Sequence, residues 1–171
     1  MQRYVLASHW APFIQNSEFK INVNIRMGEV VSLSVIPDEL FKAYRSTHYR
    51  VLEPSDFVFR IGEYSESLAL LYKEKNISSA AFLTAWNPFS RTTEQRLNDK
   101  ADQKLRDMLQ ADNIRFLNGM GEDPEGLWSA ERSVLALGIT LETAIAIGEM
   151  YYQNAIVWIA ADAVPQLKVL R

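Results

Sequence analysis

Hydrogen-bonding side chains gather where an apolar, strand-like segment passes into a helix start, in FLTAWNPFSRTTEQRLN (residues 82–98). Four of them follow one another closely along the chain: Thr84, Asn87, Ser90 and Arg91. The N-terminus of a helix presents unpaired N–H donors and a partial positive charge, so Ser90 and Arg91 beside it would suit a phosphate or carboxylate. An Asn-Pro turn, a helix cap at Thr92 and a solvated Arg91 would explain the same residues without a ligand. The segment therefore predicts either an anion-binding junction or an ordinary turn and cap.

Asn98 joins this group because of its position on the predicted helix. With Thr92 as the cap and Gln95 completing a capping box, the helix would bury one apolar stripe. The stripe consists of Leu97, Ala101, Leu105 and Met108. Asn98 lies about 60° from the centre of the stripe, at the margin of the buried face. A buried amide needs hydrogen-bond partners, which makes Asn98 a candidate site residue.

A second group of polar residues lies in GLWSAERS and QNAIVW, on either side of a later predicted helix. Its members are Trp128, Glu131, Ser133, Gln153 and Asn154. Glu131 has the chemistry of a general base or a carboxylate ligand, although most Glu side chains in turns are solvated. Gln153 and Asn154 would either satisfy backbone groups at a sheet edge or hydrogen-bond a bound ring, and Trp128 would pack or stack. The residue types and spacings of this second group do not identify a catalytic residue.

The predicted elements form two parts. The alternating segments FKINVNIR and EVVSLSVI predict a β-hairpin within an N-terminal extension over residues 1–36. Pro37 then begins a helix, predicted over DELFKAYRSTHY, that would carry Leu40, Phe41 and Tyr44 inward. From Asp56 onward, strands and helices are predicted in the order βαβαββαββ. We expect residues 37–171 to form a single α/β domain, bordering on α+β, around a mixed parallel and antiparallel sheet of about five or six strands.

Strand direction should bring the two polar groups together. Strands joined through a packed helix normally run parallel, whereas the turn predicted at residues 119–126 is short enough to reverse the chain. The first three strands after Asp56 should therefore oppose the next two. The C-terminal end of SAAFLTAW would then meet the N-terminal ends of SVLALGI and NAIVWIA at one edge, forming a composite site.

The motifs TAWNPFS, GLWSAERS and QNAIVW, with Asn98 between the first two, resemble the bacterial domain-of-unknown-function family 3293. The resemblance covers residues 41–158 and leaves the hairpin outside. It supports the single domain and the motif residues, and it implies no activity, substrate or cofactor. Two positions depart from the family pattern. Members often have Gly before the Gln-Asn pair, where this chain has Tyr152, and Arg132 is a less typical occupant of its position.

Composition excludes several classes of function. The chain has 171 residues, a formal net charge of −3 and no cysteine. It therefore has no disulfide framework, thiolate zinc site or thiol nucleophile, and its overall charge makes nucleic acid an unlikely partner. His9 and His48 lie outside both polar groups, so no metal site is predicted. The sequence has no membrane-length apolar run, and a cytoplasmic location is the default expectation.

Two functional hypotheses follow. In the first, the composite edge binds a small molecule, nucleotide-like or otherwise anionic, with or without catalysis and with an unknown cofactor requirement. In the second, the edge is structural and the hairpin docks a protein partner or a second copy of the chain by strand pairing. A cleft at the edge would favour the first hypothesis.

Overall fold

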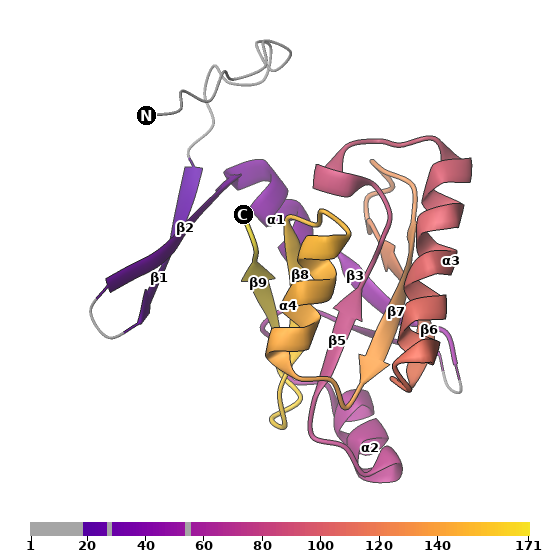
Figure 1. Ribbon diagram of the computed structural model, residues 1–171. Coiled ribbons are helices and arrows are strands. Elements are labelled where there is room, and N and C mark those ends of the chain that lie inside the picture. Colours follow the sequence, from indigo (N-terminus) through magenta and orange to yellow (C-terminus); the bar gives the residue numbers. More distant parts are fainter. Residues whose placement is uncertain (1–18, 27–28, 54–55) are drawn as a thin grey trace.

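The computed structural model describes residues 19–26, 29–53 and 56–171, which form two separate β-sheets and four α-helices (Figure 1). His9 lies outside these residues. The elements are β1 (Phe19–Arg26), β2 (Glu29–Pro37), α1 (Asp38–Ser46), β3 (His48–Val51), β4 (Phe57–Phe59), α2 (Glu66–Lys75), β5 (Ala80–Leu83), the 3-10 helix η1 (Pro88–Ser90), α3 (Gln95–Ala111), β6 (Phe116–Glu122), β7 (Glu131–Leu137), α4 (Leu141–Met150), β8 (Ala155–Ile159) and β9 (Pro165–Val169).

The large sheet has seven strands in the order β4-β3-β6-β7-β5-β8-β9, and every neighbouring pair is antiparallel. The predicted mixed α/β sheet is therefore wrong, and the fold is α+β. The predicted directions are nevertheless confirmed: β5 and β6 run the same way, and β7 and β8 oppose them. The error lies in adjacency. The connections through α3 and α4 each pass over one opposing strand, since β7 lies between β5 and β6, and β5 lies between β7 and β8.

One strand was also missed. The predicted helix after Pro37 was extended into THY, whereas α1 ends at Ser46 and β3 begins at His48. Thr47 turns the chain between them with an extended ψ of 134°, while its hydroxyl donates a 2.7 Å hydrogen bond to the carbonyl of Ala43. This β-branched residue therefore ends the helix and begins an extended segment.

The sheet is curled, and we call the face that bears Phe82 the inner face and the face that bears Leu83 the outer face. On the outer face α3 and α4 cover the sheet through Leu105 and Ile147 (Figure 1). The inner face is closed at one end by α2, the lower end in Figure 1. Alternation of side chains along each strand explains why successive residues of AAFL enter different cores.

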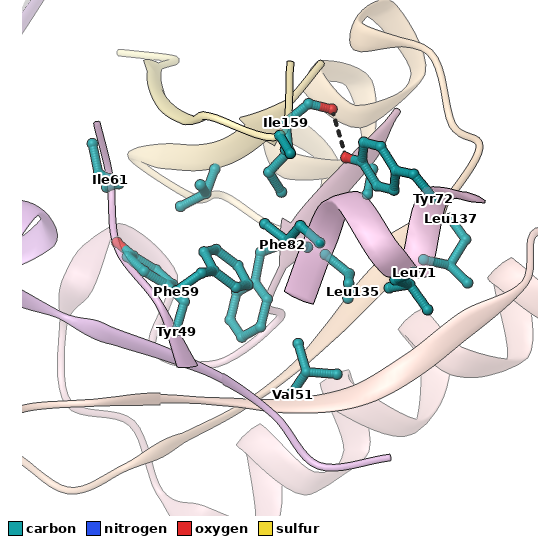
Figure 2. Packing of buried hydrophobic residues seen from close by; sticks show 14 residues of the cluster. Tyr49, Val51, Phe59, Ile61, Leu71, Tyr72, Phe82, Leu135, Leu137 and Ile159 are labelled. Carbon is teal, nitrogen blue, oxygen red and sulfur yellow. Dashed lines mark hydrogen bonds between the residues drawn. The ribbon is translucent and has the colours of Figure 1, made fainter. Parts of the chain in front are cut away.

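The inner core is dominated by aromatic rings. Figure 2 shows the rings of Tyr49, Phe59 and Phe82, from β3, β4 and β5, lying together. Their ring centroids are 5.4 to 5.6 Å apart. Tyr72 of α2 is also buried there, and its hydroxyl donates to the carbonyl of Ile159 at 3.1 Å. Because β6 and β7 lie between β3 and β5, curling of the sheet is what lets the Phe82 ring meet the rings of the neighbouring strands β3 and β4.

The predicted hairpin is confirmed, since β1 and β2 pair antiparallel and make a sheet of their own. Figure 1 shows it standing apart from the seven-stranded sheet. The predicted start of the next helix is also confirmed, with Pro37 directly before α1. The boundary between an extension and a domain at residue 36 remains a prediction. None of the helices in the described ranges is long and apolar enough to cross a membrane.

Candidate functional site

A cavity of about 280 Å³ opens on the inner face, at the end away from α2. Its apolar floor includes Tyr49, Phe82, Val157 and Leu167. These residues come from β3, β5, β8 and β9, so strands near the two opposite edges of the sheet surround one space. The concave curvature of the sheet therefore creates the cavity, and α1 lies over it through Leu40 and Tyr44.

The sequence of β7 makes one end of the inner face polar. Leu137 and Leu135 belong to the inner core, and Ser133 and Glu131 follow at the same alternating spacing toward the start of the strand and line the cavity. The end of β5 lies alongside, because Leu83 pairs with Val134 in the antiparallel register. The predicted meeting of the two polar groups at one edge is confirmed by this pairing.

Asn87 and Glu131 form the central contact between the two groups. The Asn87 side-chain amide donates to Glu131 Oε1 at 2.6 Å. Asn87 Oδ1 in turn accepts hydrogen bonds from the Thr93 backbone N–H at 3.0 Å and from Asn98 Nδ2 at 2.9 Å. Asn98 Oδ1 accepts from the Asn87 backbone N–H at 2.9 Å. The buried Asn98 thus fixes both the backbone and the side chain of the residue that holds Glu131.

The loop after β5 is held in a strained conformation. Asn87, Phe89 and Ser90 have φ values of 46°, 58° and 55°, in the left-handed region that residues with a Cβ rarely adopt. This geometry places Ser90 at the cavity, where its Oγ lies 2.8 Å from the Tyr44 hydroxyl and accepts from Asn154 Nδ2 at 3.1 Å. Such strain persists where surrounding contacts enforce it, and it is frequent at functional sites.

The electrostatics of the cavity depend on Glu131. Burial raises the pKa of the Glu131 carboxyl above its ordinary value, and the hydrogen bond from Asn87 partly opposes that rise. Burial also raises the pKa of the Tyr44 hydroxyl, which is therefore neutral near pH 7. Within the described lining there is no Lys, Arg or His. Glu131 is consequently the one carboxyl group in this lining, and no basic side chain there opposes its charge when it is ionised.

Seven of the predicted residues line the cavity: Thr84, Asn87, Ser90, Trp128, Glu131, Ser133 and Gln153. Two of these also hold the backbone, since the Thr84 hydroxyl donates to the Arg132 carbonyl at 2.7 Å and the Gln153 amide donates to the Trp86 carbonyl at 2.9 Å. Asn98 and Asn154 support the lining from behind through Asn87 and Ser90. Gln153 therefore satisfies a backbone carbonyl, as one of its two predicted roles required, and it also lines the cavity.

Arg91 and Arg132 are not part of the lining. The Arg91 guanidinium lies 5.8 Å from the centre of the Phe89 ring. Arg132 Nη1 lies 3.5 Å from Asp99 Oδ1, and the Arg132 side chain is 56% exposed. An anion in the cavity therefore gains no cationic partner from the described lining.

The predicted helix cap at Thr92 is wrong. The α3 helix begins three residues later, at Gln95, and no side chain caps it. Thr93 instead donates its backbone N–H to the Asn87 side chain, which draws the segment toward the cavity before the helix begins. The capping-box pattern considers only residues at the helix start, so it could not predict that the Asn87 side chain of the preceding turn would bind the Thr93 N–H.

The sequence predictions missed the part of the lining that comes from α1 and its end, namely Leu40, Ala43, Tyr44 and Thr47. Leu40 and Tyr44 had been placed on the inward face of the helix, which is consistent with their half-burial. No motif connected them with the polar groups. Within the described residues, no three His, Cys, Asp or Glu side chains are arranged to hold a metal ion.

The family comparison covers the central part of this site. Residues 83–156 match the family described as Protein of unknown function (DUF3293). The match confirms the resemblance over this range, while residues 41–82 and 157–158 lie outside it. The DUF3293 segment therefore contains Asn87, Asn98 and Glu131, whereas Tyr44 comes from outside. No curated protein and no solved structure matches the chain significantly.

Tyr152, predicted to depart from a Gly in the family pattern, has a backbone conformation that suits glycine. Its φ is 56°, which glycine adopts without the steric cost borne by other residues. Its ring lies 5.5 Å from the Phe89 ring, and the Arg171 guanidinium lies 4.7 Å from the centre of the Phe89 ring. Tyr152 thus packs on the outside of the strained loop and does not narrow the cavity.

Replacement of Glu131 by Gln is expected to stabilise the unliganded protein at neutral pH. The variant removes a buried charge and keeps an oxygen that accepts the Asn87 hydrogen bond. Because the folded-state pKa is raised, the carboxyl is neutral in both states at low pH, and its contribution to stability falls as pH rises from the unfolded-state pKa and is fully lost above the folded-state pKa. We expect the melting temperature to rise by at least about 2 °C at pH 7.5, the shift that roughly 1 kcal/mol produces in a chain of this size.

The gain should shrink as pH falls toward 4, because Glu131 then becomes neutral in the unaltered protein. Calorimetry across this pH range measures the difference. Glu125→Gln is the matched control, because Glu125 is exposed and does not line the cavity. A Glu131→Gln gain that does not depend on pH, or a loss of stability at pH 7.5, would contradict this account of the charge.

Proposed function

We propose that this protein binds a small organic molecule in the cavity between α1 and the inner face of the sheet. The observation that supports this most is the composition of the walls, since an aromatic and aliphatic floor meets a rim of hydrogen-bonding groups. Small-molecule sites typically combine a mostly apolar pocket with a few fixed polar groups that orient the ligand. The volume of about 280 Å³ suits a compact ligand built on one or two rings.

The rim also has the fixed geometry that binding requires. Asn87 is oriented by Asn98 and Thr93, and Ser90 is held between Tyr44 and Asn154. A ligand therefore meets polar groups whose conformational freedom is already restricted, which lowers the entropic cost of binding. The protein-interaction alternative predicted a filled edge here, and the cavity favours ligand binding over it.

A fragment screen by ligand-observed NMR tests the proposal when it is paired with a variant that fills the cavity. Ala155 lines the cavity at the start of β8, so Ala155→Leu should occupy part of its volume. We expect fragments that bind the unaltered chain to lose at least about tenfold in affinity for Ala155→Leu, which corresponds to roughly 1.4 kcal/mol.

Ala146→Leu is the matched control, because it adds the same side-chain volume at an exposed position of α4. Fragments should bind this variant as they bind the unaltered chain. Hits that are insensitive to Ala155→Leu, or the absence of any hit, would contradict the proposed binding site.

A further inference from the structure

The charge of the cavity restricts which small molecules it accepts. Glu131 brings a carboxylate to the wall, and the described part of the lining brings no cationic side chain to oppose it. The nearest basic neighbour in sequence, Arg132, lies near Asp99 instead. A ligand anion would therefore face an uncompensated negative charge in partly desolvated surroundings, whereas a ligand cation would supply the missing partner.

The shape of the acceptor favours a planar N–H group over a point charge. Asn87 Nδ2 holds Glu131 Oε1 at 2.6 Å, and Asn87 is itself fixed through Asn98, so the carboxylate has a defined orientation. Planar groups with two parallel N–H donors match a carboxylate in a bidentate geometry that an ammonium does not reproduce.

The aromatic lining independently favours the same ligand class. Tyr44, Tyr49, Phe82 and Trp128 all contribute to the cavity wall. Aromatic rings attract flat, delocalised cations through their electron-rich faces and also pack against an apolar ring. A small molecule with an aromatic body and a cationic, planar N–H head therefore complements both the floor and the rim.

We propose that the cavity selects small molecules that carry a planar cationic N–H group, such as an amidinium, a guanidinium or a protonated aminoheterocycle, and that the Glu131 carboxylate binds this group. The inference rests on the proposed small-molecule function and specifies its ligand. It replaces the anionic ligand expected from the Ser90–Arg91 sequence, which the lining does not support. Burial of the Glu131 carboxyl raises its pKa, and a bound cation would offset that cost.

Three isosteric probes test the charge preference on the full, unaltered chain: benzamidine, benzamide and benzoate. They share a ring and a planar head of the same size and differ in charge from positive through neutral to negative. At pH 7.5, isothermal titration calorimetry should find that benzamidine binds at least about tenfold more tightly than benzoate, with benzamide between them. This comparison requires no variant, so it does not depend on how a substitution folds.

Glu131→Gln then tests the residue. Benzamidine should bind this variant at least about tenfold more weakly, while benzamide should change by less than about threefold, and the control Glu125→Gln should change neither. Benzoate binding most tightly, particularly if Arg91→Ala weakens it, would overturn the proposal in favour of an anion site. The proposal would also be overturned if benzamidine bound Glu131→Gln with the same affinity as the unaltered chain. If none of the probes binds while other fragments bind and remain sensitive to Ala155→Leu, the cation proposal fails and the proposed function survives.

Discussion

Asn98→Ala is expected to destabilise the protein by about 2 to 4 kcal/mol, although Asn98 is a polar residue on a largely polar helix. The side chain is 3% exposed and makes hydrogen bonds to the Asn87 backbone, the Asn87 side chain and the Thr93 carbonyl. Its removal leaves the Asn87 N–H and the Thr93 carbonyl without this partner, at about 1 to 3 kcal/mol for each buried unsatisfied group. It also releases the strained turn that begins at Asn87.

Urea denaturation measures this effect, with Leu97→Ala as the matched control on the preceding residue. Leu97 is 48% exposed, so its truncation should cost less than about 1 kcal/mol. Benzamidine binding is a second measurement. Asn98→Ala should weaken it, because Asn98 orients Asn87 and Asn87 in turn orients Glu131. If Leu97→Ala proves the more damaging change, the assignment of the buried face of α3 is wrong.

The contrast between these two residues shows where helical periodicity fails. Apolar spacing predicted a stripe through Leu97 and Met108, whereas the buried residues of α3 are Asn98, Asp102, Leu105 and Leu109. The face is rotated because its polar members have partners. Asp102 accepts from Arg106 Nε at 2.8 Å, and Asn98 bonds to Asn87. Hydropathy does not reveal such hydrogen-bond partners, so the apolar pattern placed Asn98 only at the margin of the buried face and left Asp102 out of it.

The fold shows a similar division between local and long-range information. Element types after Asp56 followed from periodicity, and their directions followed from connection lengths. The insertion of β7 between β5 and β6 did not, because strand adjacency depends on which edges remain free as the sheet assembles. A mixed sheet and an antiparallel one can share the same order of elements and the same strand directions.

The candidate site was predictable to the extent that it lies in local motifs. Asn87, Ser90 and Glu131 were found because Asn-Pro turns and polar residues at strand ends are recognisable. Tyr44 was not assigned to the site, because its relation to Ser90 depends on how α1 crosses the end of the sheet. The anionic ligand stays a prediction that the position of Arg91 does not support, since Arg91 is next to Ser90 in sequence but is not part of the cavity lining and lies 5.8 Å from the centre of the Phe89 ring.

Gly119 and Gly121 illustrate the same limit. The glycine-rich segment GMGEDPEG was predicted to be a turn, yet β6 continues to Glu122 and includes both residues. Glycine is a turn signal because it tolerates unusual backbone angles, but within a strand it can also mark a close approach of another group. Phe82 makes that approach: a Cβ on Gly119 would lie 2.6 Å from Phe82 Cε2 and 2.9 Å from the Arg50 carbonyl oxygen.

Gly119→Ala is therefore expected to destabilise the protein by about 2 to 3 kcal/mol through overpacking. Gly121→Ala, two residues along the same strand, should be neutral or stabilising by about 0.5 kcal/mol, since its Cβ would meet only Thr47 Cγ2 within 4 Å, at 3.8 Å, and alanine is less flexible when unfolded. Equilibrium unfolding of the two variants compares these opposite signs directly.

The Gly119→Ala substitution should also change the shape of the cavity. The Phe82 ring forms part of the floor, so a methyl group at Gly119 should push it into the space proposed for the ligand. We expect Gly119→Ala to weaken benzamidine binding even at temperatures where the variant is fully folded. Combining it with Phe82→Leu should recover part of the lost stability, but not all of it, because the Arg50 carbonyl contact remains. Equal stabilities for Gly119→Ala and Gly121→Ala would show that the sheet relaxes around the added methyl group and that Phe82 does not require a glycine on β6.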